Sequence, residues 1–316
     1  MRVAIVALVL ISACTDVSAP ADDDPAETAG DGLLPDIDGK SDGPYVATGT
    51  TLSFQLESGA FPGAGHPDVV VYLPSRLDPT PPVDVIVFLH GWYNCASNVV
   101  GATDTVCTTG TGTRKSYALA AQLEASNKNA ILIVPELAYD QPNGDPGALA
   151  GSGAMRAMID ETLGKLEPTL GPLSADDVGR LVVASHSGGY NTAAAFVHAG
   201  GMPVAELYLL DSLYGHTADF DAYVTSATAD FADLSRRFAT VYTYSGGTLA
   251  NSQAMATRAK SWLSSSAIVD DRTTSTWTAP TYAHGLLFKR TGLTHDGVPR
   301  YYFGRLVTTS ALADVE

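Results

Sequence analysis

Short apolar runs alternate with helix-length segments along most of this chain, and this alternation constrains the fold more than any other feature of the sequence. Mostly apolar runs of this length are typical of strands that are buried on both faces of a sheet. Strands that alternate with helices form a mostly parallel sheet with helices on its two faces. The sequence therefore predicts an α/β fold with a mostly parallel central β-sheet flanked by helices on both faces. The predicted strands are residues 83–89, 130–134, 181–184, 207–210, 239–244 and 286–288, and the predicted helices are residues 114–126, 153–167, 191–199, 231–238, 252–264 and 298–309.

Two further runs precede this alternation. Residues 51–56 alternate between apolar and polar side chains, and residues 68–73 end at Pro74, so we expect these two runs to form an antiparallel edge of the sheet. The chain shows no internal repeat and no second apolar block long enough for a core of its own. Residues 45–316 are therefore predicted to form one domain.

The first residues are typical of an export signal. Arg2 is followed by an apolar run over residues 3–13, which is too short to span a bilayer as a mature helix. Residues 11–14 read Ile-Ser-Ala-Cys and resemble the bacterial lipobox, in which a diacylglycerol is attached to the cysteine before cleavage in front of it. The resemblance implies a lipoprotein signal peptide at residues 1–13, with Cys14 as the lipidated first residue of a protein anchored to a membrane of the bacterial cell envelope. The alternative is an ordinary cleavage site near Ala13, with Cys14 as a spare thiol in a secreted protein.

Acidic residues are concentrated directly after this signal. Residues 15–42 contain nine acidic residues and one lysine, and so carry −8 of the formal net charge of −16. This stretch, rich in Asp, Gly, Pro, Ala and Ser, does not bury enough apolar surface to offset the entropy of ordering it, so residues 14–44 are predicted to be a disordered acidic tether. An acidic surface repels phosphate backbones, which argues against a nucleic-acid partner.

The two other cysteines, Cys95 and Cys107, lie in a stretch of Asn, Ser, Thr and Gly. In an exported protein such a pair is most simply a disulfide that closes a surface loop, and two free thiols are the alternative. A zinc site needs more soft ligands nearby than this stretch offers, so we expect no metal here.

A motif typical of nucleophilic catalysis follows the apolar run at residues 181–184. Residues 185–189 read Ser-His-Ser-Gly-Gly, which is a Gly-x-Ser-x-Gly elbow with Ser185 in place of the first glycine. Small residues are needed at the flanking positions, because larger side chains at this strained strand-to-helix turn collide with the neighbouring elements. Ser187 is therefore the candidate nucleophile. The alternative is that the small residues only make a tight turn.

A second motif, His90-Gly91-Trp92, follows the predicted strand at residues 83–89. Gly91 lets the backbone turn so that the next amide faces the site, and the amides of Trp92 and Gly188 are the candidate donors of an oxyanion hole. We expect His90 to brace this loop through hydrogen bonds instead of acting as a base. Tyr93 either adds a hydroxyl donor or lines the cleft.

With these two motifs the chain resembles the α/β-hydrolase family of serine hydrolases over nearly all of residues 45–316. It looks closest to the secreted esterase and depolymerase-like branch, because a strand that ends in Pro74 precedes the His-Gly strand. The family order of nucleophile, acid and histidine then implies where the remaining catalytic residues lie.

The resemblance implies that His295 is the catalytic base. His295 lies just after the last predicted strand and just before the last predicted helix, where the family keeps its imidazole. His284 is the alternative, although it precedes the last strand and so belongs to the opposite end of it. His198 is about three turns along the helix from Ser187, and His216 comes too early for the family order.

The acid is placed by the same argument. Asp211 directly follows the predicted strand at residues 207–210, where some family members keep their carboxylate, and from there it can fix the tautomer of the imidazole. Its alternative role is a structural carboxylate that caps the loop after the strand. The other candidate acids are Asp219, Asp221, Asp270 and Asp271.

The resulting expectation is a serine hydrolase that cleaves a carboxylic ester, in preference to an amide, through an acyl-enzyme. The substrate is expected to be a small or polymeric ester, and the loops around the site carry no large apolar lid of the kind a long-chain lipase needs. No metal or organic cofactor is required by this chemistry, and the protein is expected to be a monomer. The rival interpretation from another class is a non-catalytic lipid-anchored binding or scaffolding lipoprotein that retains the fold.

Overall fold

The computed structural model describes residues 46–316, except residues 143, 245–246, 276 and 278. The predicted signal peptide at residues 1–13, its Cys14 and the acidic tether at residues 14–44 therefore lie outside the described residues. Within the described part, no helix combines the length and the apolar character that crossing a membrane requires.

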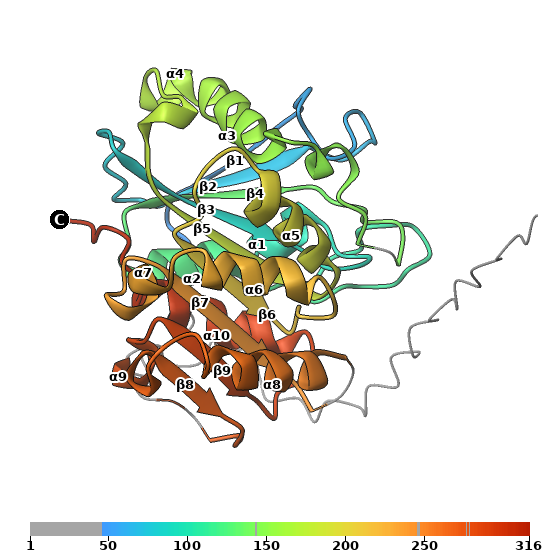
Figure 1. Ribbon diagram of the computed structural model, residues 1–316. Helices are drawn as coiled ribbons and strands as arrows, with labels where there is room; N and C mark the ends of the chain where they lie inside the picture. Colours follow the sequence, from blue (N-terminus) through green and yellow to red (C-terminus); the bar gives the residue numbers. More distant parts are fainter. Residues whose placement is uncertain (1–45, 143, 245–246, 276, 278) are drawn as a thin grey trace, which may run out of the picture. The chain divides into compact units, whose positions relative to one another are not determined.

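The described residues form a nine-stranded sheet with the order β1-β2-β4-β3-β5-β6-β7-β9-β8 (Figure 1). Its strands from β4 to β8 along this order are parallel, whereas β1 and β2 pair antiparallel at one edge, as the sequence predicts. The strands are β1 (Thr50–Phe54), β2 (Val69–Leu73), β3 (Val83–Leu89), β4 (Ala130–Pro135), β5 (Val178–His186), β6 (Glu206–Leu210), β7 (Arg237–Tyr242), β8 (Ile268–Asp271) and β9 (Leu286–Arg290).

Helices cover both faces of the sheet (Figure 1). One face packs against α3, α5, α6 and α8, and the other packs against α1, α2 and α10. The α-helices are α1 (Ala96–Val100), α2 (Leu119–Ser126), α3 (Ala154–Lys165), α4 (Glu167–Leu170), α5 (Tyr190–Ala199), α6 (Thr217–Thr225), α7 (Thr228–Ala232), α8 (Gly247–Ala259), α9 (Ala279–Tyr282) and α10 (Gly297–Thr308), and a short 3-10 turn, η3 (Ser187–Gly189), joins β5 to α5.

The central strand β3 shows why its sequence is almost continuously apolar. Val85 and Val87 belong to the core on one face of the sheet, while Ile86 and Phe88 belong to the core on the other. Successive side chains of a strand point to opposite faces, so a strand covered on both sides has no exposed position for a polar residue. This confirms the prediction of a mostly parallel sheet between two helical layers.

The structure corrects one predicted helix. Residues 231–238 are predicted to be helical, but α7 ends at Ala232 and β7 begins at Arg237. Leu234 between them has a φ of 68°, a left-handed conformation that interrupts a helix. Pairing of β7 with β6 and β9 buries Phe238 completely, and this tertiary burial outweighs the local preference.

Several short elements have too weak a pattern to be predicted, and β8 and α6 are examples. The edge strand β8 is only half-buried along its length, and α6 lies in a segment whose polar sequence favours a loop. Short elements with one covered face give few apolar positions, so periodicity identifies them poorly.

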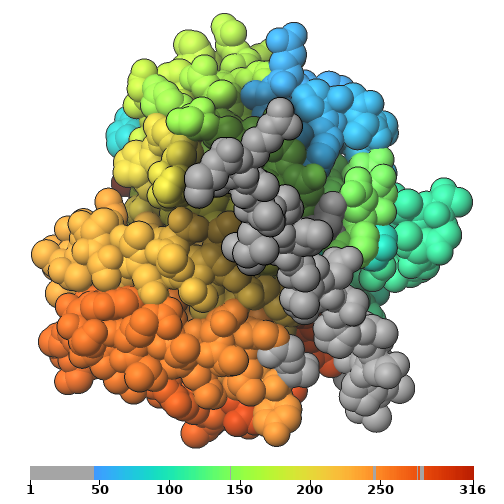
Figure 2. Space-filling view, turned by 45° about the vertical axis from the view of Figure 1, so that its right-hand side comes forward, coloured from blue at the N-terminus to red at the C-terminus, as the bar shows by residue number. Residues whose placement is uncertain are grey.

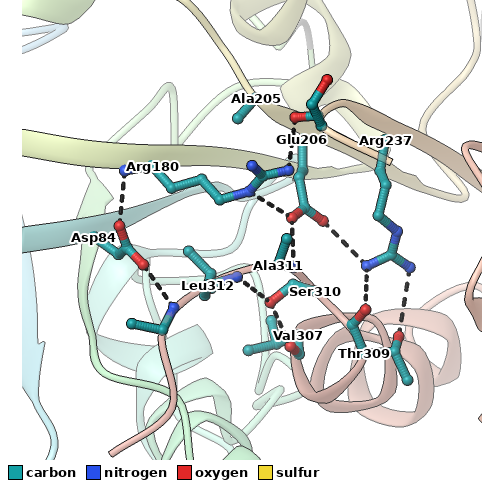
Figure 3. Close-up of polar contacts among 12 residues, drawn as sticks. Asp84, Arg180, Ala205, Glu206, Arg237, Val307, Thr309, Ser310, Ala311 and Leu312 are labelled. Atoms are coloured by element: carbon teal, nitrogen blue, oxygen red, sulfur yellow. Dashed lines mark hydrogen bonds and ion pairs between the residues drawn. The ribbon is translucent and has the colours of Figure 1, made fainter. Parts of the chain in front are cut away.

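A buried polar network closes the amino-terminal edge of the sheet (Figure 3). Glu206, which is completely buried, receives hydrogen bonds from Arg180 Nε at 2.9 Å and from Arg237 Nη1 at 3.1 Å. The backbone N–H of Ala311, beyond α10, also donates to Glu206 at 2.9 Å. The network therefore fastens the chain that follows α10 to the first residues of β6 and β7, at the edge opposite the one that carries Ser187.

Candidate active site

Ser187 lies at the turn between β5 and α5, in the short segment η3. Its φ is 51°, a left-handed conformation that strains any residue with a Cβ. A Cβ at Gly91 would lie 2.6 Å from the Cβ of Ser187, and a Cβ at Gly189 would lie 2.4 Å from the carbonyl oxygen of Leu89. The crowding explains why glycines surround this serine in both motifs.

Ser185, which replaces the first glycine of the motif, is completely buried and has a specific partner. Its Oγ lies 2.9 Å from Oγ of Ser212, the residue after Asp211. Ser212 Oγ in turn donates a hydrogen bond to the carbonyl oxygen of Ser187 at 2.8 Å. The turn that carries the candidate nucleophile is thus tied to the turn that carries the candidate acid.

Asp211 and His295 form an ion pair at the carboxyl-terminal edge of the sheet. His295, in the loop between β9 and α10, places Nδ1 at 2.7 Å from Oδ2 of Asp211. The Asp211 side chain is 1% exposed and that of His295 is 27% exposed. Asp211 also accepts hydrogen bonds from the N–H of Thr243 at 3.0 Å and from the hydroxyls of Thr243 at 2.9 Å and Thr248 at 2.6 Å. These donors fix the carboxylate so that it orients the imidazole, and Nδ1 carries the proton of the pair.

The other histidines that follow the motif are placed elsewhere. His284 precedes β9 at the opposite end of that strand, and its Nδ1 lies 3.0 Å from the carbonyl oxygen of Thr281. His216 and His198 both contact Asp219, with Nδ1 of each at 2.9 Å and 3.5 Å from its carboxylate. None of these three contacts Asp211 in a hydrogen bond or ion pair among the described residues.

The remaining candidate acids are each paired with a cation or histidine outside this site. Asp219 contacts the two histidines just named. Asp221 binds Arg258, Asp270 binds Lys260 and Arg272, and Asp271 binds Lys289. Asp211 is therefore the candidate acid that the fold brings to His295.

The candidate oxyanion donors Trp92 and Gly188 lie against each other. A Cβ at Gly188 would lie 2.3 Å from Nε1 of Trp92, so only glycine fits beside the indole ring. Trp92 Nε1 is buried and has no hydrogen-bond partner among the described residues. The two loops that carry the candidate donor amides are therefore adjacent and close to Ser187.

Comparison with known proteins agrees with this architecture. Neither a scan against protein-family models nor a search of curated proteins returns a match for this chain. Among solved structures, the chain is similar to a serine-to-alanine mutant of the feruloyl esterase module from Clostridium thermocellum complexed with sinapinate, with a TM-score of 0.55, 13% identity, and coverage of 89% of this chain and 92% of that chain. A protein called FAE gives a TM-score of 0.52 at 13% identity, with coverage of 83% of this chain and 88% of that chain. This chain has the α/β-hydrolase fold.

His90 braces the loop that follows β3. It is 1% exposed, and its Nδ1 lies 2.9 Å from the carbonyl oxygen of Gly91. Tyr93, which follows Trp92 in this loop, has a φ of 54°, and the guanidinium of Arg114 lies 4.9 Å from its ring centroid. Both residues thus have structural contacts within the loop.

The candidate site includes a histidine that the sequence alone does not identify. His186 is buried next to the candidate nucleophile Ser187, and its ring centroid lies 4.3 Å from that of His295. His186 Nε2 lies 3.2 Å from the carbonyl oxygen of His295, and Nδ1 lies 2.8 Å from the hydroxyl of Tyr117. Burial, together with the neighbouring imidazole of His295, holds the pKa of His186 well below its usual value. The only sequence signal that places His186 in the site is its position next to Ser187 in the motif.

The predicted disulfide between Cys95 and Cys107 is formed. Cys95 directly precedes α1, so the bridge closes the segment that follows the His90-Gly91-Trp92 motif. The side chain of Asn94 reinforces the same segment, because its Nδ2 donates to the carbonyl oxygen of Lys115 at 3.0 Å.

A cavity of about 170 Å³ opens beside β4. Its walls come from residues 61–68 and 136–141, and Figure 2 shows the blue and the green segments of this face side by side. The hydroxyl of Tyr139 donates to the carbonyl oxygen of Ala64 at 2.7 Å and joins the two walls. Across the described residues, no group of three or more His, Cys, Asp or Glu side chains is arranged to hold a metal ion.

Proposed function

We propose that this protein is a serine hydrolase that cleaves carboxylic esters through Ser187, His295 and Asp211. The observation that carries the proposal is the 2.7 Å contact between Asp211 Oδ2 and His295 Nδ1, made at the sheet edge where β5 presents Ser187. An imidazole held in this way has its lone pair on Nε2, the atom that acts as a base in a triad.

The reaction proceeds in two halves. His295 takes the proton of Ser187 as Oγ attacks the acyl carbon, and the carbonyl oxygen becomes an oxyanion that accepts hydrogen bonds from the amides of Trp92 and Gly188. The C–O bond to the leaving group then breaks, and the alcohol receives the proton from His295. A water molecule attacks the acyl-enzyme in the same manner, which releases the carboxylic acid and restores Ser187.

The preference for an ester over an amide is also part of the proposal. It is supported by the fold shared with a feruloyl esterase module whose structure holds sinapinate. The strained backbone of Ser187, with φ at 51°, supports a catalytic protein over a binding module, because strain of this kind is retained where it serves a function.

We further propose that the protein is exported and anchored. In this arrangement residues 1–13 are a lipoprotein signal peptide, Cys14 carries the lipid, and residues 14–44 are an acidic tether that links the membrane to the catalytic domain at residues 45–316. The hydrophobic run before Cys14 and the acidic residues after it support this organisation. Replacing Cys14 by Ala should move the protein from the membrane fraction to the soluble fraction, and an unchanged partition would contradict the anchor.

Labelling with a fluorophosphonate probe tests the catalytic proposal directly. The folded wild-type protein should become covalently labelled, and a Ser187→Ala variant should not. Absence of labelling in folded wild-type protein, or equal labelling of the variant, would refute the assignment of the nucleophile.

A further inference from the structure

The two peptide groups assigned to the oxyanion hole are both held on their carbonyl side by buried side chains. The carbonyl oxygen of Gly91 lies 2.9 Å from Nδ1 of His90. The carbonyl oxygen of Ser187 accepts a hydrogen bond from Oγ of Ser212 at 2.8 Å. His90 and Ser212 come from different strand ends, yet each contacts the carbonyl that belongs to the peptide of one proposed donor.

Because a peptide group is planar, a contact that fixes its carbonyl also fixes the direction of its N–H. A trans peptide is planar, and its N–H points in the direction opposite to its C=O. Within the described residues the only cis peptide bond joins Pro81 to Pro82, so the peptides that follow Gly91 and Ser187 are both trans. Holding the Gly91 carbonyl therefore aims the N–H of Trp92, and holding the Ser187 carbonyl aims the N–H of Gly188.

The partners of Ser212 determine which hydroxyl is the donor in each of its two hydrogen bonds. A carbonyl oxygen only accepts, so Ser212 donates its hydroxyl proton to Ser187. The oxygen of Ser212 then accepts from the hydroxyl of Ser185, whose Oγ lies 2.9 Å away. Both serines are 0% exposed, so water does not compete for these bonds.

The His90 contact has a second support behind it. Because the Gly91 carbonyl only accepts, Nδ1 of His90 carries a proton whatever the state of Nε2. Nε2 faces both the N–H of Leu137 at 2.9 Å and Oε1 of Glu136 at 2.9 Å. A neutral Nε2 accepts from the N–H of Leu137, whereas a protonated Nε2 donates to Glu136. In either state one contact on this side holds the plane of the ring and hence the direction of the Nδ1 proton.

Glu136 is itself anchored. It is 6% exposed, and it accepts from the N–H of Ala96 at 3.2 Å and contacts Nδ1 of His66 at 3.4 Å. Burial by itself raises the pKa of Glu136, but the contacts with His66 and His90 outweigh it and leave the pKa below its usual value. Glu136 thus remains a carboxylate at the back of the loop.

We propose that His90 and Ser212, supported by Glu136 and Ser185, are positioning residues that aim the two oxyanion donors before substrate arrives. The inference rests on the proposed function, since it assumes that the amides of Trp92 and Gly188 stabilise an oxyanion. Donors fixed in advance need not reorganise as charge develops, which is the main source of such stabilisation. This role also gives a reason for serine at position 185, because a glycine there would leave the oxygen of Ser212 without its donor.

The serine arm can be tested with a matched control. Ser212→Ala and Ser185→Ala remove the two hydroxyls in turn, and Ser252→Ala removes a completely buried hydroxyl of α8 that bonds Thr240 of β7. The readouts are the second-order rate of fluorophosphonate labelling and the kcat and KM for p-nitrophenyl acetate. We expect the labelling rate and kcat to fall about tenfold in Ser212→Ala and about threefold in Ser185→Ala, with KM changed less than about twofold. These losses are smaller than the loss caused by deleting an oxyanion donor, because a misaligned donor still stabilises the oxyanion in part. Ser252→Ala should stay within about twofold of wild type in every parameter.

Two further measurements separate positioning from general loss of structure. The double variant Ser185→Ala/Ser212→Ala should be no slower than Ser212→Ala alone, because the outer hydroxyl acts only through the inner one. The affinity for phenylboronic acid, which forms a tetrahedral adduct with the nucleophile, should fall in parallel with kcat.

For the histidine arm, Glu136→Gln should lower kcat and phenylboronic acid affinity together, again with little change in KM.

The outcomes distinguish this inference from the proposed function. If wild-type protein is not labelled, the proposed function fails and the inference fails with it. If wild type is labelled but Ser212→Ala and Glu136→Gln both retain wild-type kcat and boronate affinity, the positioning role is wrong while the hydrolase remains. If Ser212→Ala does not fold, Ser185→Ala and Glu136→Gln decide the question by the same criteria, and a loss of kcat without a parallel loss of boronate affinity overturns the inference.

Discussion

Asp211 and His295 are 84 residues apart in the sequence, and in the folded protein their side chains meet at 2.7 Å between Oδ2 and Nδ1. Asp211 follows β6 and His295 follows β9, so parallel strands deliver both to the same edge of the sheet. The carboxylate is buried and surrounded by donors from Thr243 and Thr248. The imidazole is consequently held in one orientation while its other side remains partly exposed.

Asp211→Asn should lower kcat for an aryl ester roughly ten-thousand-fold, because the amide no longer fixes the tautomer of His295. His295→Ala should be at least as severe. Steady-state kinetics with p-nitrophenyl acetate measures both effects. Asp270→Asn is the matched control, since Asp270 lies on the outermost strand β8 and binds Lys260 and Arg272, and it should remain near wild type. The assignment is wrong if the control loses activity while Asp211→Asn keeps it.

Ser187→Gly should be more stable than Ser187→Ala by about 1 kcal/mol, although neither variant should turn over substrate. The reason is the φ of 51° at this position, which glycine adopts freely and alanine does not. Urea denaturation monitored by circular dichroism gives the two free energies of unfolding. An alanine variant as stable as the glycine variant would show that the turn is not strained.

Glu206→Gln should destabilise the protein by about 3–5 kcal/mol, because it leaves the buried guanidinium of Arg237 without its counter-charge. Arg237 is 2% exposed and lies 3.1 Å from Glu206. Asp176→Asn, which breaks the exposed pair with Arg156, serves as the control and should leave the unfolding midpoint almost unchanged. A Glu206→Gln midpoint equal to that of the control would mean that the network in Figure 3 contributes little to stability.

Asp271 should make the folded protein sensitive to acid. Burial by itself raises the pKa of this carboxyl, but hydrogen bonds from Lys289, Thr273 and Trp277 outweigh it and lower the pKa from 3.8 to about 2. A carboxyl with a lowered pKa in the folded state contributes stability that is complete above the unfolded value and is lost as the pH falls from 3.8 toward about 2.

The ionised Asp271 side chain contributes about 2 kcal/mol to the free energy of unfolding. Asp271→Asn should therefore show its full deficit in the free energy of unfolding at neutral pH and a smaller deficit at low pH. Urea titrations of wild type and variant at both pH values give the comparison. Equal deficits at the two pH values would contradict the ionic contribution of Asp271.

Local sequence is sufficient for several parts of this structure. The apolar runs that become β3, β4 and β5 are buried on both faces of the sheet. Such strands are recognisable from their nearly continuous apolar sequence. The turn at Ser187 is also recognisable from its small neighbours Gly188 and Gly189, although the atoms that require glycine there belong to Trp92 and to Leu89 at the end of β3. The disulfide between Cys95 and Cys107 also follows from the sequence, since these are the only cysteines after Cys14.

Other features depend on contacts between distant segments. The helix predicted at residues 231–238 is divided into α7 and β7 because strand pairing buries Phe238, which no local pattern encodes. The edge strand β8 exists only because β9 offers it a partner. The sequence narrows the acid to a handful of aspartates, but only the fold brings Asp211, and not Asp270 or Asp271, to His295.

The sequence by itself determines the α/β architecture and the identity of the candidate nucleophile, because both are written in neighbouring residues through strand periodicity and turn sterics. Only the tertiary structure decides which side chains hold the candidate oxyanion donors in place. The contacts of Ser212 with Ser185 and of His90 with Glu136 join residues that are far apart in the chain, and hydrogen bonds depend on distances that folding alone sets. The direction of the donor amides is therefore a property of the assembled sheet edge and not of either motif.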